Sequence, residues 1–367
     1  MSLELASLAR LHAVEMSGDE GVVEGPLHGY HHETYVFPLS REMEGGRSGR
    51  WKCREPRADL LWFDRRCFSS EENLLRALHG QILRIPDIID VDGVGLQSFI
   101  EGETLAYFHK SGTMVPDNFL DQIMDLFRQM VGIRPDSLSV ERRCRLDDRP
   151  DDGDTDGFLE RLVLFAEQRV YRANLERFAG LFDDLWLGED SFRHLRKNVF
   201  GLERRPFCLL HADLHRENFI VDAESTLWTI DWELAMLGDP LYDLATHLHL
   251  MRYPARQERV VAQRWCETVE GVRVGSSNGW GDDLERLLTY KKAQSVFTDV
   301  IRTALELDAD PEPSWWQIAP AAFKLRKVLA VAASSLGLEE VPGTRRIVTA
   351  LMRWCREHGS VPGEKAP

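Results

Sequence analysis

Short apolar runs separated by glycine-rich turns dominate the first hundred residues of the chain. The segments ETYVFPL (33–39) and RWKCREP (50–56) are typical of strands, and a glycine-rich turn lies between them. In the segment 69–83, leucines recur on one face behind an N-terminal serine, which predicts a helix. Two more short strands are expected over 85–102. This part of the chain therefore reads as a small β-rich region that carries one helix.

Helical spacing of the apolar residues takes over after about residue 103. Residues 118–133, 157–171 and 242–357 all show it, and two short apolar strands are expected within 207–235. The acidic segment 145–157 contains Pro and Gly, which indicates an exposed loop. The functional alternative for that loop is a lid that attracts a cationic substrate.

Composition and charge exclude several classes of protein. The chain has 367 residues, 43% apolar and 29% charged, as in an ordinary soluble globular protein. It has no apolar run long enough for a membrane span, and its N-terminus is typical of an amphipathic helix rather than a signal peptide. Its six cysteines form no C-x-x-C pair, which favours free thiols in the cytoplasm. The net charge of −15 disfavours a nucleic-acid-binding protein, which needs a basic surface.

A cluster of polar residues between apolar flanks carries the candidate chemistry. The stretch LHADLHRENFI (210–220) has the pattern H-x-D-x-x-x-x-N, and TIDWE follows, with Asp231 at the end of a short strand. Phosphoryl transfer needs a carboxylate that orients a hydroxyl group and accepts its proton, together with oxygen ligands for Mg²⁺. Asp213 fits the base, and Asn218 and Asp231 fit the metal ligands. The alternative for any one of these residues is a hydrogen-bonded turn.

A zinc site is a second chemical alternative for this stretch. His211 and His215 are four residues apart and would share one face of a helix. The metalloprotease pattern has a glutamate after the first histidine, where this chain has Ala212, and no third ligand is evident. Zinc is therefore the weaker interpretation.

The segment LHADLHRENFIVD…TIDWELAMLGDPLYDLA resembles the aminoglycoside phosphotransferase and choline kinase family, which has a protein-kinase-like fold. The resemblance is specific over 207–247 and looser over 25–106. It implies a bilobal α+β fold. A small antiparallel β-rich N-terminal lobe (1–102) would carry the phosphate side of the nucleotide, and a larger, mainly helical C-terminal lobe (103–367) would carry the catalytic loop (211–218).

The resemblance also implies roles at the catalytic centre. His211 would open the catalytic loop, and Asp213 would be the catalytic base. Asn218 and Asp231 would hold Mg²⁺, Asp231 being followed by Trp and Glu as is usual in this family. His215 is common at its place in the family and is expected to be architectural.

In the N-terminal lobe, the resemblance requires a cation that pairs with phosphates and with a helix carboxylate. Lys52 and Arg54 both point to one face of a strand, because they are two residues apart. The pattern of relatives lines up best with Arg54, which would suit bidentate phosphate contact. Glu71 matches the helix carboxylate, and Glu72 is the alternative.

Two further segments are expected to contact the nucleotide, which is ATP or GTP bound with Mg²⁺. The phosphate-covering loop should lie in LHGYHHETYVF, where Gly29 is the only glycine. The histidines of that loop, His31 among them, are either phosphate donors or exposed turn residues. The hinge that binds adenine through backbone groups is expected at Ser98, Phe99 and Ile100.

Two functions of different classes remain open. The first is a cytoplasmic kinase that transfers the γ-phosphate of ATP to a hydroxyl group of an antibiotic-like or aminoglycoside-like small molecule, or to Ser or Thr of a precursor peptide in lanthipeptide-type maturation. The second is a catalytically silent, kinase-like scaffold among other biosynthetic enzymes. The acceptor pocket is expected to involve helices over 290–307 and 313–327, whose aromatic and basic residues suit a peptide or an acidic group. Neither function involves nucleic acid or a membrane.

Overall fold

The chain folds into two compact units, each assembled from separate stretches of sequence. The structure, a computed structural model, describes residues 7–27, 32–39, 49–57, 63, 65–308 and 313–358. The first unit comprises residues 1–145, 207–237 and 250–274, and the second comprises residues 146–206, 238–249 and 275–367. This grouping does not test the predicted boundary between lobes at residues 102 and 103, which stays a prediction.

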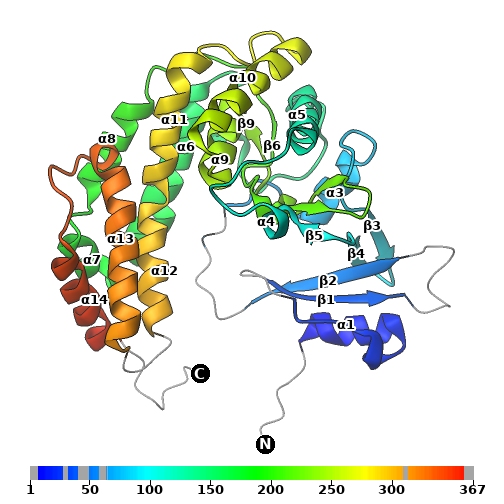
Figure 1. Cartoon of the computed structure of the whole chain (residues 1–367), viewed down its shortest axis with the longest axis horizontal. Helices are drawn as coiled ribbons and strands as arrows, with labels where there is room; N and C mark the ends of the chain where they lie inside the picture. The colour runs from blue at the N-terminus through cyan, green and yellow to red at the C-terminus, as the bar shows by residue number, and fades with distance from the viewer. Residues whose placement is uncertain are drawn as a thin grey trace, which may run out of the picture. The chain divides into compact units, whose positions relative to one another are not determined.

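A four-stranded antiparallel sheet forms the N-terminal part of the first unit (Figure 1). Its order is β1 (His32–Pro38), β2 (Arg50–Pro56), β4 (Val94–Ser98) and β3 (Ile88–Val91). β1 and β2 pair along their full length. β2 and β4 pair only where Trp51 faces Ser98 and Lys52 faces Gln97. The strands expected from the sequence are present, but β2 pairs with β4 over a much shorter length than it pairs with β1.

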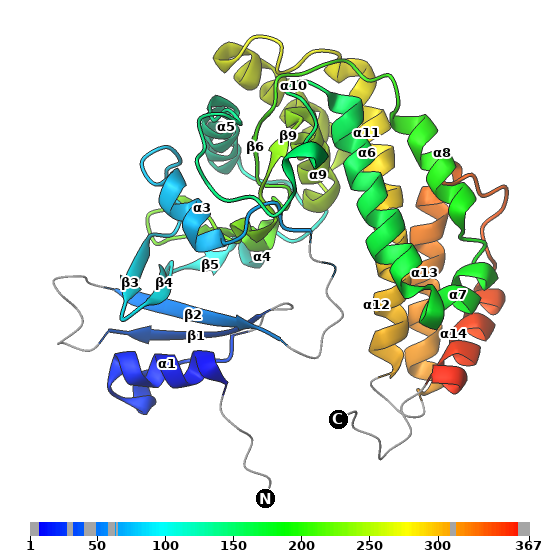
Figure 2. The same cartoon turned by 180° about the vertical axis from the view of Figure 1, so that it is seen from behind.

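Helix α1 (Leu8–Ser17) lies along β1 and β2 in both Figure 1 and Figure 2. Ser7 accepts a hydrogen bond from the Arg10 N–H in the first turn, and Gly18 ends the helix in the left-handed conformation. Apolar residues of the helix pack against apolar residues of the sheet in one core. The helix contributes Ala9, Ala13 and Met16, and the sheet contributes Tyr35, Phe37, Trp51, Cys53 and Leu96. Each large apolar side chain buried there contributes about 1.5–3 kcal/mol, so this helix stabilises the sheet.

Helix α3 (Glu71–Leu78) begins within the predicted segment but ends at Leu78 rather than at residue 83. Ser70 accepts a hydrogen bond from the Asn73 N–H at 3.1 Å, as a helix N-cap does. The predicted end is wrong because the backbone leaves the helical conformation at His79, whose ψ is 128°, and Gly80 follows with a φ of +78°. The leucines of the predicted apolar face are buried: Leu74, Leu75 and Leu78.

Five short strands surround the polar stretch of the sequence. β5 (Glu103–Thr104), β7 (Phe219–Val221) and β8 (Leu227–Thr229) form one antiparallel sheet, and β6 (Cys208–Leu210) pairs with β9 (Met236–Gly238). The sequence predicted β7 and β8 but not β6 and β9. Helices complete this unit: α4 (Leu105–Phe108), α5 (Asp117–Gly132) and α10 (Ala255–Val272).

The second unit is helical. Its helices are α6 (Thr155–Phe165), α7 (Leu175–Asp184), α8 (Glu189–Val199), most of α9 (Pro240–Met251), α11 (Trp280–Gln294), α12 (Val296–Asp308), α13 (Trp315–Leu336) and α14 (Thr344–His358). Figures 1 and 2 both show α12, α13 and α14 side by side. Stacked and edge-on aromatic rings fill the core; for example, the ring centroids of Phe192 and Phe297, which are stacked, lie 4.5 Å apart. No helix in the described ranges has the length and apolar character needed to cross a bilayer.

The second unit contains a buried ionic network of Arg205, Asp239 and Asp283. Arg205 is fully buried, and its Nε donates to both carboxylate oxygens of Asp239, at 2.8 and 3.0 Å. Its Nη1 donates to Asp283 at 2.8 Å. Charges removed from water in this way are tolerated only when they are paired and hydrogen-bonded, so the network depends on all three side chains.

The acidic segment 145–157 is mostly exposed up to Asp152, as the sequence predicts. Its last residues instead begin α6, where Asp154 accepts a hydrogen bond from the Gly157 N–H at 3.0 Å. The alternative role as a lid stays a prediction.

Candidate active site

The polar loop 211–218 runs from the end of β6 to the start of β7. Ala212 has a φ of +63°, a strained conformation for a residue with a Cβ, and it turns the chain directly before Asp213. Arg216 then fastens the loop, because its buried guanidinium donates to three backbone carbonyls: those of His109 (2.9 Å), Thr113 (2.8 Å) and Met251 (3.0 Å). The loop is therefore held in one shape by contacts far away in the sequence.

Asn218 positions Asp213 directly. Its Nδ2 donates to the Asp213 backbone carbonyl at 2.9 Å and to Asp213 Oδ2 at 3.2 Å. This arrangement leaves the Asn218 Oδ1 without a hydrogen-bond donor among the described residues. An amide that orients a carboxylate and keeps one oxygen available is suited to a place beside a cation.

His215 contacts the same carboxylate oxygen of Asp213 as Asn218 does. Its Nδ1 accepts a hydrogen bond from the Glu217 N–H at 3.2 Å, so the proton of the neutral ring is on Nε2, which faces Asp213 Oδ2 at 3.4 Å. Burial raises the pKa of Asp213, but the His215 ring, helped by the charge of Arg65, outweighs burial and holds that pKa below its usual value. Asp213 is therefore ionised at neutral pH, as a base must be.

His211 has a structural place in the loop. Its ring is fully buried 4.6 Å from the ring of Trp232, and its Nε2 lies 3.1 Å from the carbonyl of Ile230. Burial lowers its pKa to about 4, so it stays neutral. His211 Nε2 faces the Ile230 carbonyl, whereas His215 Nε2 faces Asp213 Oδ2. Within the described ranges, no group of three or more His, Cys, Asp or Glu side chains is arranged to hold a metal ion.

Asp231 stands at the end of β8, close to the loop. The Ile230 N–H donates to the carbonyl of Asn218 at 3.0 Å, which joins the two segments. Asp231 has a φ of +64°, and its carboxylate accepts no hydrogen bond from the described residues. Burial, followed by repulsion from Glu233 and Asp213, raises its pKa. A carboxylate in this state is stabilised by a cation, so Asp231 and the Asn218 Oδ1 fit the predicted Mg²⁺ site.

Glu71 connects α3 with this centre. One carboxylate oxygen accepts a hydrogen bond from the Trp232 N–H at 2.8 Å, directly after Asp231, and the other pairs with the Arg54 guanidinium. Glu72 is more exposed and lies 3.8 Å from Arg54. The structure therefore brings Arg54 together with Glu71, the pair that the sequence favoured.

Lys52 is on the same face of β2 but has a different environment. It is half-buried and makes no hydrogen bond or ion pair with the described residues. Burial, reinforced by the nearby Arg54 charge, lowers its pKa to about 8. It is therefore a second cation on this face of β2, apart from the Arg54–Glu71 pair.

The predicted hinge follows β4. The Ser98 N–H donates to Asp87 and the Phe99 N–H to Arg50, at 2.8 and 2.9 Å, whereas the Ile100 N–H makes no such bond among the described residues. The chain then passes so close to β7 that a Cβ on Gly102 would lie 2.3 Å from a backbone oxygen. Gly29 and His31, predicted for the phosphate-covering loop, lie outside the described residues.

The structure adds contacts at this centre that the sequence did not indicate. His32, at the start of β1, has its Nδ1 3.6 Å from Glu233 Oε2, and both side chains are largely buried. His32 is one of the histidines of LHGYHHETYVF that were predicted as phosphate donors or exposed turn residues. Arg216 was not singled out, because a charged residue beside an apolar run is usually a solvated position.

The helices predicted to line an acceptor pocket have mixed environments. Lys291 is buried and donates to the Tyr242 hydroxyl at 3.0 Å, whereas Trp315 and Trp316 are exposed. The acceptor pocket itself stays a prediction.

Comparisons with known proteins agree with this arrangement. A model of the phosphotransferase enzyme family, APH, matches residues 28–275. A search of curated proteins found no match. A choline/ethanolamine kinase family protein from Mesorhizobium loti is similar in structure, with 18% identity, a TM-score of 0.50 and coverage of 94% of this chain and 98% of that one. The gentamicin–APH(2″)-IIa complex has 17% identity, a TM-score of 0.50 and coverage of 93% and 99%. These likenesses confirm the predicted bilobal, protein-kinase-like α+β fold.

Proposed function

Because this chain belongs to the phosphotransferase enzyme family, we propose that it transfers the γ-phosphate of ATP to a hydroxyl group of a small molecule. Membership confirms the predicted enzyme class, a phosphotransferase. The observation that carries the proposal is the convergence of Asp213, Asn218 and Asp231 from two separate segments, with the Arg54–Glu71 pair tied to the second segment.

Asp213 is the base in this proposal. It is ionised at neutral pH, and Asn218 and His215 both hold its Oδ2. A carboxylate held in this way orients the acceptor hydroxyl and accepts its proton, while positioning supplies most of the rate enhancement. His215 keeps the carboxylate charged and oriented but has no direct role in the transfer.

The cation and the nucleotide have separate binding groups. Asn218 Oδ1 and the Asp231 carboxylate would hold Mg²⁺, which supplies neutralisation of phosphate charge when bound. Arg54 would contact the phosphates through the part of its guanidinium that Glu71 does not occupy. The Ile100 N–H, in the predicted hinge, would donate a hydrogen bond to the adenine ring.

The test is mass spectrometry of an acceptor panel incubated with ATP, Mg²⁺ and the protein. The panel holds aminoglycosides, other antibiotics, choline-like amines, sugars and any precursor peptide encoded beside the gene. Asp213→Asn keeps an oxygen that can accept from Asn218 but removes the base, so transfer should fall by about 10²–10⁴-fold. Asp136→Asn, at an exposed position, is the matched control and should be unaffected.

Each outcome decides between the two functions. A phosphate-sized mass gain on one acceptor, lost only in Asp213→Asn, would establish the kinase and name its substrate class. Transfer that survives Asp213→Asn would refute the assigned base. If no acceptor gains mass and Mg–ATP does not raise the melting temperature, the chain is a silent scaffold and the proposal is wrong.

A further inference from the structure

Two cysteines that are far apart in the sequence lie close together in the first unit. Phe68 and Arg142 form an isolated antiparallel bridge between two segments of the chain. Beside this bridge, the Arg143 N–H donates to the Cys67 carbonyl at 2.9 Å. Cys67 directly precedes the bridge and Cys144 follows it by two residues, so the paired backbone holds the two cysteines next to each other.

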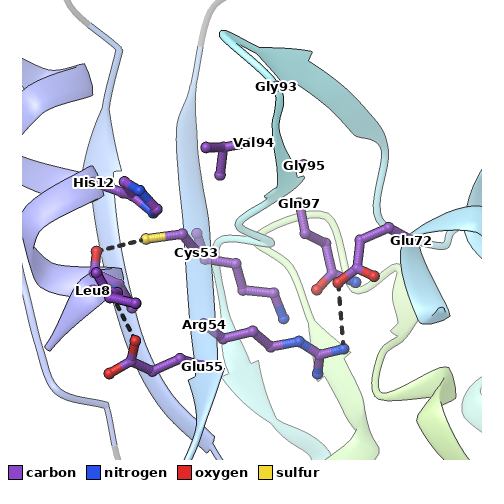
Figure 3. A pocket seen from close by; sticks show the side chains of 12 residues that line it. Leu8, His12, Cys53, Arg54, Glu55, Glu72, Gly93, Val94, Gly95 and Gln97 are labelled. Atoms are coloured by element: carbon purple, nitrogen blue, oxygen red, sulfur yellow. Dashed lines mark hydrogen bonds and ion pairs between the residues drawn. The ribbon is translucent and has the colours of Figure 1, made fainter.

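The two side chains are also in contact. The Cys67 thiol hydrogen-bonds to the side chain of Cys144. Both residues are partly exposed, and both thiols are free. Cys53 has different surroundings: Figure 3 shows it pointing toward α1, where its thiol donates to the Ala9 carbonyl at 3.0 Å. A disulfide forms without backbone movement only where the two cysteines are already adjacent, and Cys67 and Cys144 meet that condition.

The shared proton gives the two sulfur atoms different roles. The hydrogen bond to Cys144, followed by burial, raises the pKa of the Cys67 thiol, although the charge of Arg142 acts in the opposite direction. Cys67 therefore keeps its proton and donates it to the Cys144 sulfur. Each cysteine follows two arginines, in the stretches RRC (65–67) and RRC (142–144), and such cations favour a neighbouring thiolate. The nucleophile of the pair is therefore Cys144.

We propose that Cys67 and Cys144 are a reversible oxidation site, which hydrogen peroxide converts to a disulfide that clamps the segment before α3 to the segment after the Arg142 bridge. Cys144 is the attacking sulfur and Cys67 is the resolving sulfur. The proposal does not depend on the proposed function, because its readouts are masses and exchange rates rather than phosphoryl transfer.

The oxidation takes two steps. The Cys144 thiolate attacks one oxygen of the peroxide, so that an S–O bond forms, the O–O bond breaks, and the departing hydroxide takes up a proton to become water. The Cys67 sulfur then attacks the sulfenic acid on Cys144. The S–S bond forms, the S–O bond breaks, and the Cys67 proton leaves with the hydroxyl group as a second water. Two thiols are thus oxidised while one peroxide is reduced, and a small dithiol reverses the reaction by thiol–disulfide exchange.

The disulfide acts where α3 begins. Cys67 lies three residues before Ser70, the N-cap of α3, and Glu71 follows. In the reduced chain, hydrogen bonds alone hold this segment in place, among them the bond from the Ser69 N–H to the Glu141 carbonyl at 3.1 Å. A covalent link that closes a long loop restricts the open and unfolded forms of the chain. The oxidised protein should therefore open less often at this bridge.

Peptide mapping by mass spectrometry tests the site. The folded full chain is treated with stoichiometric hydrogen peroxide, and the remaining thiols are then blocked with iodoacetamide. We expect one linked peptide pair, Cys67 with Cys144, that has lost two hydrogen atoms and is separated by dithiothreitol. Blocked thiols at both positions after oxidation, or linkage of either cysteine to a different one, would overturn the proposal.

Variants assign the two roles. Cys67→Ser should trap Cys144 as a sulfenic acid that dimedone labels, whereas Cys144→Ser should give neither the disulfide nor a dimedone adduct at Cys67. Cys266→Ser, at a partly exposed cysteine of α10, is the control and should form the same linked pair as the unmodified chain. A dimedone adduct at Cys67 in Cys144→Ser would contradict the assigned roles. Melting curves show whether each variant is folded, and the mapping of the unmodified chain decides the site if one is not.

Hydrogen exchange measures the clamp. The amides of Ser69 and Arg143 both donate across the bridge, so we expect them to exchange at least about tenfold more slowly in the oxidised protein. The Ser98 amide, which donates to the Asp87 carbonyl at 2.8 Å, is the control and should exchange at the same rate in both forms. Equal rates at Ser69 and Arg143 before and after oxidation would refute a clamp at the start of α3.

Discussion

Replacing Glu71 by glutamine tests the connection between α3 and the catalytic centre. The Glu71 side chain is 3% exposed and that of its partner Arg54 is 17% exposed. Removing one partner of a fully buried ion pair costs about 3–5 kcal/mol. Because Arg54 retains some contact with water, and because glutamine still offers an oxygen to the Trp232 N–H, we expect a loss of about 2–3 kcal/mol in the free energy of unfolding.

Glu72 is the matched control in the same helix. Its side chain is 33% exposed and lies 3.8 Å from Arg54, so Glu72→Gln should cost no more than about 1 kcal/mol. Glu71→Ala should cost about 1 kcal/mol more than Glu71→Gln, because it also removes the acceptor of the Trp232 N–H.

Urea unfolding followed by tryptophan fluorescence measures these losses, and titration with Mg–ATP measures their effect on the nucleotide. If Glu71→Gln releases Arg54 from its position, Mg–ATP affinity should fall by about tenfold or more, since tenfold corresponds to about 1.4 kcal/mol. A Glu72→Gln variant that loses as much stability or affinity as Glu71→Gln would refute the assignment of Glu71 as the partner of Arg54.

Three further predictions concern other parts of the structure. His211 has a pKa of about 4 in the folded chain and 6.5 in the unfolded chain. The stability that it contributes is therefore complete above pH 6.5, and the free energy of unfolding falls by about 1.4 kcal/mol per pH unit as the pH falls toward 4. Urea unfolding across this range should show a shallower pH dependence for His211→Gln than for the unmodified chain. Arg205→Met should lose about 3–5 kcal/mol in urea unfolding because it leaves the buried Asp239 carboxylate without its cation and Asp283 with only Arg286, whereas Arg204→Met, at an exposed position, should change stability by less than about 0.5 kcal/mol. Asn218→Ala should raise the Mg²⁺ concentration for half-maximal transfer by about tenfold, and an unchanged Mg²⁺ dependence would exclude Asn218 as a ligand.

Local pattern was sufficient for the catalytic loop and for most of the secondary structure. Asp213, Asn218 and Asp231 lie within one short stretch of sequence, and their spacing is itself the signal. β1 and β2 were found because each is a short extended run beside a turn, and α5 because its apolar residues recur at helical spacing. Such features depend on neighbours in the sequence, so the sequence displays them directly.

Features that depend on two distant segments could not be found in this way. The end of α3 was misplaced because the apolar pattern continues past the residue where the backbone turns at Gly80. β6 and β9 were missed because each is defined by its pairing with the other, which lies on the far side of the catalytic loop in the sequence. The anchoring of Arg216 to three carbonyls depends on segments about a hundred residues upstream and on the last residue of α9.

Lys52 and Arg54 show the division most clearly. The sequence by itself determined that both cations lie on one face of β2, because side chains two residues apart on a strand point the same way. It also determined that a carboxylate would be available in the following helix. Only the tertiary structure decided that α3 places Glu71 against Arg54, and that β4 leaves β2 after Lys52 and Gln97. The physical reason is that side-chain direction is local, whereas the partner of a buried charge is set by which elements pack together.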